Sequence, residues 1–187
     1  ITTELDRLSA GVPAPDATLV RDLRARGLVV TPLTRNGALL DVDCSHAQPP
    51  VGGTDLANLA PIAANICWLD LGGSAIADGD LTALAAMPHL NRLHLERTAV
   101  SDAAGPRLAA CARLEYLNLV GTRIGDAGIA ALAGLPAIDA IYLWQSQASE
   151  AGIAALRTAL PEAVIDSGPM LEPSTAPPPK RKRRKQQ

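Results

Sequence analysis

The side chains with the most evident chemistry in this 187-residue sequence are its few aromatic residues and the charged residues spaced around them. The chain has two Trp, two Tyr and no Phe, and Arg92 lies midway between Trp68 and Tyr116. Aromatic rings with a guanidinium group between them are typical of surfaces that bind partners by stacking and cation–π contact. We therefore predict a contact surface that consists of Trp68, Asp70, Arg92, His94, Glu96, Tyr116, Asn118, Tyr142 and Trp144.

His94 offers a second kind of chemistry, because an imidazole beside a carboxylate can transfer protons. Asp70 lies 24 residues before His94 and Glu96 lies two residues after it, so an enzyme that uses His94 with Asp70 or Glu96 is one interpretation. However, the sequence contains no G-x-S-x-G motif and no phosphate-binding glycine loop, and no nucleophile or metal set accompanies these residues. We predict no catalytic residue and no enzymatic activity.

The potential metal ligands elsewhere in the chain do not form a recognisable site. Cys44 and His46 are close together, but no second ligand pair completes a zinc motif. The three cysteines, which include Cys67 and Cys111, show no disulfide framework, and we expect Cys111 to lie in the core. No C-x-x-C-H segment for covalent haem is present. We predict neither a metal nor another cofactor.

An internal repeat positions the candidate contact residues, and its 24-residue units begin at Ile66, Leu90, Leu114 and Ile138. The first, fourth and sixth positions are aliphatic in every unit, and the nineteenth is always Leu. The two-residue period of positions four and six indicates a strand with one buried face, whereas Leu81, Leu84 and Met87 have a helical spacing. The third, fifth and seventh positions must then face outward, and every aromatic residue occupies one of them.

Two polar columns of the repeat have structural interpretations. The thirteenth position is acidic and precedes each helical run, so we expect a row of helix caps from Asp78, Asp102, Asp126 and Glu150. The ninth position carries a hydroxyl group that can satisfy backbone groups in the loop after each strand, in Ser74, Thr98, Thr122 and Ser146.

The pattern L-x-x-L-x-L-x-x-T-x-I-x-D-x-G-I/L-x-x-L-x-x-L-P resembles a leucine-rich repeat in which Thr or Ser stands where Asn or Cys is frequent, and it covers residues 66–163. The resemblance implies an α/β leucine-rich-repeat solenoid with parallel strands on the concave face and helices on the convex face. About four regular 24-residue units would follow an N-terminal cap. The outward strand positions would lie on the concave face, where we predict non-enzymatic binding of a protein or peptide by a monomeric domain.

The chain divides into three regions. Residues 1–65 form a capping region with one irregular repeat, residues 66–168 form the repeats, and residues 169–187 form a tail. In the cap, residues 16–26 predict an amphipathic helix that ends at Gly27 before a strand at 28–30. A strand at 38–42 and a helix at 55–64 predict the irregular unit, and residues 163–166 predict a last strand. Gly105 and Pro106 predict a short, late or irregular helix in the second unit.

Charge is distributed unevenly between the body and the tail. Before residue 180 the chain has 11 Arg and 19 acidic residues, a formal charge of −8, whereas the tail carries six positive charges. The Pro-rich residues 173–179 predict an extended, disordered tail. One interpretation is weak, salt-screened contact with anionic lipid or nucleic acid through Lys180, Arg181, Lys182, Arg183, Arg184 and Lys185. The alternative is a solvated tail that folds back weakly on the acidic body.

Residues 114–149 are similar to the C-terminal repeats of bacterial, planctomycete-type membrane-associated proteins that carry a c-type cytochrome domain upstream. The segment from Ile141 to Ser146 and the lead-in over residues 27–43 carry this resemblance. It implies an extracytoplasmic location on a bacterial membrane, and a passive structural domain of such a protein is the alternative function. The chain begins with Ile, so we expect it to be a fragment or a processed product, and no apolar run approaches the roughly 20 residues that span a bilayer.

Overall fold

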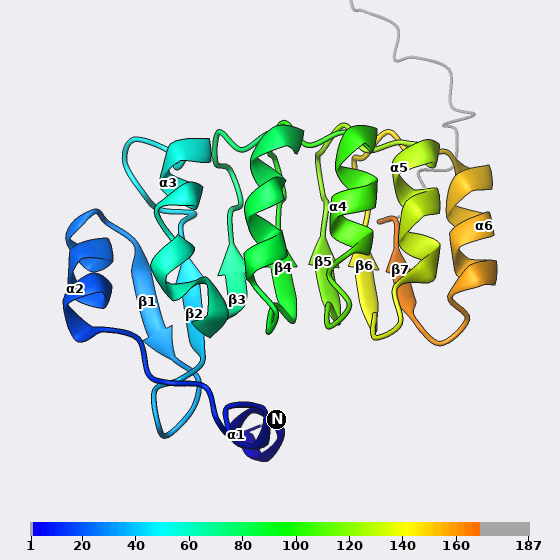
Figure 1. Cartoon of the computed structure of the whole chain (residues 1–187). Coiled ribbons are helices and arrows are strands. Elements are labelled where there is room, and N and C mark those ends of the chain that lie inside the picture. The colour runs from blue at the N-terminus through cyan, green and yellow to red at the C-terminus, as the bar shows by residue number, and fades with distance from the viewer. Residues whose placement is uncertain (1, 169–187) are drawn as a thin grey trace, which may run out of the picture.

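The fold has two layers, a sheet and a row of helices, in a computed structural model that describes residues 2–168 (Figure 1). The sheet has seven strands in chain order: β1 (Val29–Pro32), β2 (Leu40–Asp43), β3 (Ile66–Asp70), β4 (Arg92–His94), β5 (Tyr116–Asn118), β6 (Ala140–Tyr142) and β7 (Val164–Asp166). None of the helices between residues 2 and 168 has the length and apolar character needed to cross a membrane. The predicted basic tail lies outside the described residues.

The strands from β2 to β7 pair in parallel, and from β3 onward each pairing is offset by 24 residues, as between Trp68 and Arg92. An α/β fold with a parallel sheet and helices was expected from the repeat pattern and is confirmed. The antiparallel pairing of β1 with β2 was not expected. Its cause is the short connection between residues 33 and 39, because a short turn returns the chain antiparallel, whereas a parallel return needs a longer crossover.

Helical segments complete the second layer. They are α3 (Gly53–Ala57), η1 (Ala60–Asn65), η2 (Asp78–Ala86), η3 (Asp102–Ala104), α4 (Gly105–Ala109), α5 (Asp126–Ala131), η4 (Leu132–Gly134) and α6 (Glu150–Ala159). Several are 3-10 helices, the longest being η2. Leu81 and Leu84 of η2 and Met87, which follows directly after it, are spaced every third residue, which matches the three residues per turn of a 3-10 helix. The short helix predicted around Pro106 is confirmed as η3 followed by α4.

Aliphatic columns of the repeat form the core between the two layers. Leu69, Leu93, Leu117 and Ile141 are each 0% exposed, as are Leu71, Leu95 and Leu119 of the sixth position. All belong to one continuous hydrophobic cluster that also takes in the inward sides of the helices. Burial of these columns is the main reason that successive strands stack in this register.

Three residues of the acidic column, Asp78, Asp102 and Asp126, link neighbouring repeats, which corrects their expected role as hydrogen-bonding caps of their own helices, whereas Glu150 lies in the first turn of α6. Asp78 accepts hydrogen bonds from the backbone N–H and the hydroxyl group of Ser101, each at 2.7 Å. Asp126 makes the same pair of contacts with Ser149. Asp102 accepts from the N–H groups of Gly125 and Gly128, at 2.6 and 2.9 Å. These carboxylates therefore satisfy backbone donors where the next helix begins, rather than at their own helix, because stacking places that helix start within reach.

The hydroxyl column has the predicted role at three of its four positions. Thr98 and Thr122 donate to the carbonyl groups of Leu95 and Leu119 at 2.7 Å, and the hydroxyl of Ser146 accepts from the N–H of Ala148. The buried hydroxyl of Ser74 has no hydrogen-bond partner among the described residues. The column therefore satisfies loop backbone groups, but not in every repeat.

The N-terminal region covers the first edge of the parallel sheet. Helix α2 (Ala17–Ala25) is capped by Asp16 and is followed by Gly27 at φ +89°, as predicted. The helix expected over residues 55–64 is divided into α3 and η1. Helix α1 (Thr2–Leu8) was not predicted. Its Leu5 belongs to a small cluster with Leu39 and Cys67, against which Trp68 packs.

Candidate functional site

The sheet face opposite the helices, which we call the open face, carries two rows of side chains that the strand register brings together. One row contains Trp68, Arg92, Tyr116 and Ala140. The next contains Asp43, Asp70, His94, Asn118, Tyr142 and Asp166. The 24-residue separation of these residues in the sequence thus places Trp68 beside Arg92 and Asp70 beside His94.

Arg92 lies between two aromatic rings on the open face. Its Cζ atom is 4.7 Å from the centroid of the Trp68 ring and 5.8 Å from that of Tyr116. Both distances fall within the range of cation–π attraction, so the rings hold the guanidinium group in place. The predicted stacking of Arg92 between Trp68 and Tyr116 is confirmed.

The ring contacts continue along the face from Tyr116. Its ring centroid is 4.8 Å from that of His94 and 5.1 Å from that of Tyr142, with tilts of 30° and 38°. Burial and the neighbouring Tyr142 raise the pKa of the Tyr116 phenol, so it remains a neutral hydrogen-bond donor at neutral pH. The described face thus presents a connected aromatic surface with Arg92 within it.

The two tryptophans mark the ends of this surface and differ in burial. Trp144 is 46% exposed and lies against Gly168, where a Cβ atom would collide with the indole ring. Trp68 is half-buried, since it packs on the cluster beneath α1, and its Nε1 has no hydrogen-bond partner among the described residues. Trp68 therefore contributes to the core of the N-terminal region as well as to the open face, which the sequence pattern did not indicate.

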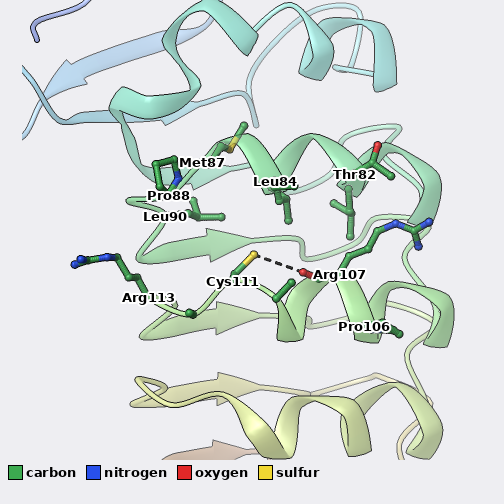
Figure 2. Close-up of a pocket in the computed structure, with 13 residues that line it drawn as sticks. Thr82, Leu84, Met87, Pro88, Leu90, Pro106, Arg107, Cys111 and Arg113 are labelled. Atoms are coloured by element: carbon green, nitrogen blue, oxygen red, sulfur yellow. Dashed lines mark hydrogen bonds between the residues drawn. The ribbon is translucent and has the colours of Figure 1, made fainter. Parts of the chain in front are cut away.

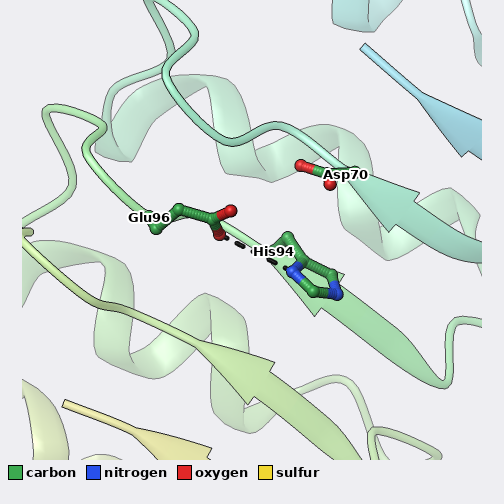
Figure 3. A group of neighbouring side chains, drawn as sticks. All are labelled: Asp70, His94 and Glu96. Atoms are coloured by element: carbon green, nitrogen blue, oxygen red, sulfur yellow. Dashed lines mark ion pairs between the residues drawn. The ribbon is translucent and has the colours of Figure 1, made fainter. Parts of the chain in front are cut away.

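Asp70, His94 and Glu96 converge near the middle of the sheet (Figure 3). One potential ligand atom from each lies within 4.8 Å of the others, and His94 Nδ1 is 3.6 Å from Glu96 Oε2. The Glu96 carboxylate raises the pKa of His94 against the opposing effect of burial, and His94 lowers the pKa of Glu96. Burial raises the pKa of Asp70, although its Oδ1 accepts a hydrogen bond from the Gly72 N–H at 2.8 Å.

This cluster corrects the expectation that no metal set accompanies His94. Within residues 2–168, Asp70, His94 and Glu96 are the one group of three or more such side chains close enough to hold a metal ion. Cys44 and His46 do not belong to such a group; Cys44 is buried and His46 is exposed. The 24-residue offset between Asp70 and His94 was the available signal, but the approach of Glu96 depends on the turn after β4.

A groove on the helix side was missed by the sequence analysis (Figure 2). It lies between η2 and α4 and has a volume of about 670 Å³. Gly105 packs so closely on Gly128 that a Cβ atom would come 2.8 Å from its carbonyl oxygen, so α4 lies against α5 on one side and borders the groove on the other. The glycine and proline at 105–106 were the sequence signal for this irregularity.

Cys111 lines this groove and is half-buried, so it packs against the edge of the expected core rather than inside it. Its Sγ lies 3.6 Å from the Arg107 carbonyl oxygen. Burial raises the pKa of the Cys111 thiol to about 11, so the thiol is protonated at neutral pH and is a poor nucleophile or metal ligand.

Of the comparisons with known proteins, the match to a family model agrees with the repeat pattern. Residues 110–133 match the family model described as a leucine-rich repeat. No curated protein matches the chain. A solved structure of a leucine-rich repeat protein from Leptospira interrogans is 16% identical, with a TM-score of 0.39, and the match covers 58% of this chain and 33% of that one. The chain thus spans about a third of that protein's length.

Proposed function

We propose that this chain, which carries a leucine-rich repeat at residues 110–133, binds a protein or peptide on its open face. Leucine-rich repeat domains generally mediate protein–protein interactions, and repeat proteins use the long concave surface that stacking creates. The face would be concave in a solenoid of about four units over residues 66–168, with residues 1–65 as a cap. The domain acts as a monomer without enzymatic activity.

The placement of Arg92 between Trp68 and Tyr116 is the observation that carries this proposal. Arg, Trp and Tyr are the residue types that most often dominate binding energy at interfaces. Here the rings already hold the guanidinium group, so little conformational entropy is lost when a partner contacts it. Tyr142 and the exposed Trp144 extend the same surface toward β7.

The alternative is a passive structural domain of a larger membrane-associated c-type cytochrome protein. The rings contact one another, as Tyr116 contacts Tyr142, and rings that only shield the sheet need no partner. This observation favours the passive domain. The two functions differ in one measurable respect. A binding surface loses affinity when single side chains on it are removed, whereas a passive surface has no ligand to lose.

Selection of peptides from a displayed random library tests the proposal even though the natural partner is unidentified. The affinity of a selected peptide is then compared for the native chain, Arg92→Ala and Tyr142→Ala. Because Trp68 also packs on the α1 cluster, it is not used. Arg21→Ala is the matched control, since Arg21 is exposed on α2.

Each open-face substitution should weaken binding by about 10- to 30-fold, which corresponds to about 1.4–2 kcal/mol. Arg21→Ala should leave the affinity unchanged. Failure to select any peptide, or equal affinities for all the variants, would overturn the proposed binding role and favour the passive domain.

A further inference from the structure

We propose that Asp70, His94 and Glu96 bind a divalent transition-metal ion of the zinc type. Asp70 and His94 are the last residues of two adjacent strands, and Glu96 returns toward them from the turn after β4 (Figure 3). Ligands at about 2.0–2.1 Å from a tetrahedral zinc ion are about 3.3 Å apart. The 3.6 Å between His94 Nδ1 and Glu96 Oε2 is close to that separation, and the Asp70 carboxylate is within 4.8 Å.

Gly72 provides space for the two carboxylates. A Cβ atom at this position would lie 2.7 Å from Glu96 Oε1 and 3.1 Å from Asp70 Oδ1. The backbone of Gly72 is not in the left-handed region, so its conformation alone does not require glycine. The absence of a side chain there lets Glu96 approach the ends of β3 and β4, where a metal ion would contact both carboxylates.

One carboxylate oxygen of Glu96 lacks a hydrogen-bond donor among the described residues. This atom, Oε2, is buried, and no hydrogen bond to it is found within residues 2–168. A buried carboxylate oxygen without a donor is costly, and the 3.6 Å contact with His94 is too long for a good hydrogen bond. A metal ion between these two groups would remove that cost.

The surrounding charge attracts a cation. A small cavity beside the cluster, with a volume of about 220 Å³, is lined by Asp41, Asp43 and Asp70 as well as by His94. Burial raises the pKa of Asp41, and the nearby Asp43 and Asp70 raise it further, because the carboxylates repel one another. Arg92 lines the same cavity and is the opposing charge, with its guanidinium group over the Trp68 ring, so three carboxylates face one cation there.

The donor set determines which ions should bind best. Imidazole nitrogen is preferred by zinc and neighbouring transition metals, whereas Ca²⁺ and Mg²⁺ prefer an all-oxygen shell. Three protein ligands leave a fourth position of a tetrahedral ion for water. The inference concerns the metal alone and does not depend on peptide binding to the same face.

Calorimetric titration of the metal-stripped full chain with ZnCl₂ tests the site. We expect one ion per chain, bound at least tenfold more tightly than Ca²⁺ or Mg²⁺. Asp70→Asn removes the charge but can keep the hydrogen bond from the Gly72 N–H, because Asn118 accepts the equivalent bond from the N–H of Val120 elsewhere in the sheet. This variant should fold normally and lose at least tenfold in zinc affinity, as should Glu96→Gln.

His46→Gln is the matched control, because it removes the exposed histidine beside Cys44 and leaves the cluster intact. Its zinc affinity should equal that of the native chain. Imidazole NMR signals provide a readout that needs no variant, since zinc should shift His94 before His46 or His89. Absence of saturable zinc binding, binding unaffected by Asp70→Asn, or a first shift at His46 would overturn the site.

Discussion

The two faces of the sheet differ in whether equivalent positions carry the same residue type in every repeat. On the helix-facing side, the fourth position is aliphatic in each repeat, and Leu69, Leu93, Leu117 and Ile141 are each 0% exposed. On the open face, equivalent positions carry different chemistry, as in the row that runs from Asp70 through His94 and Asn118 to Tyr142. The fold needs the same residue type in every repeat on one face only, so residues on the open face are free to differ from one repeat to the next.

Removal of a repeated core side chain should have the largest effect on stability. Leu117→Ala should lower the free energy of unfolding by about 2–5 kcal/mol, because it leaves a cavity in the middle of the core. Chemical denaturation followed by circular dichroism measures the change. A loss no greater than that of an open-face variant such as Arg92→Ala would remove the distinction between the faces.

Removal of a link between repeats should have the next largest effect. Asp102→Ala takes away the acceptor of two backbone N–H groups, those of Gly125 and Gly128. We expect a loss of about 1–2 kcal/mol, comparable to that of a helix cap. Asp139→Ala is the control for the change in charge, since Asp139 is exposed. Equal stability of both variants would contradict a role in stacking.

Truncation on the open face should affect stability least among these single substitutions. Arg92→Ala removes the cation–π contacts with Trp68 and Tyr116, which are worth about 0.5–1 kcal/mol in a partly exposed setting. The same denaturation experiment measures this change. A loss as large as that of Leu117→Ala would mean that the open face is required for folding.

The smallest predicted change in stability is that of Asp126→Asn, and it should depend on pH. Hydrogen bonds from Ser149 lower the pKa of Asp126 below its usual value of about 3.9. A carboxyl group with a lowered pKa stabilises the fold above its unfolded pKa, and this contribution is lost as the pH falls through the folded value. Asp126→Asn should therefore be slightly less stable than the native chain at neutral pH. The two should converge in acid, below the lowered pKa, and melting curves across this range would show whether they do.

Regular parts of the fold were predictable because stacking repeats the same local environment. The columns at Leu69 and Leu71 define the buried face, and the 24-residue offset correctly pairs Trp68 with Arg92. Contacts that depend on how far one repeat reaches into another were not predictable. The carboxylate of Asp102 bonds to the next helix start, although its sequence position suggests a cap on its own helix.

In the candidate site, too, the pairing of residues on neighbouring strands was predictable, whereas the contacts made by loops were not. The sequence places Asp70 and His94 side by side, but the approach of Glu96 depends on a turn conformation and on the space left by Gly72. The partial burial of Trp68 depends on α1, which lies more than 60 residues earlier in the chain and carries no repeat signal. The approach of Glu96 depends on one loop, and the burial of Trp68 depends on a contact that is distant in sequence. The period of the repeat predicts neither kind of contact.

The affinity of a selected peptide for the double variant Arg92→Ala/Tyr142→Ala tests whether the open face is the binding surface. The measurement is made at a temperature where both the native chain and the variant are fully folded. We expect a folded variant whose affinity is reduced about 100-fold or more, since two contact residues are removed together. A folded variant that binds the peptide as tightly as the native chain would contradict the assignment of the open face as the binding surface.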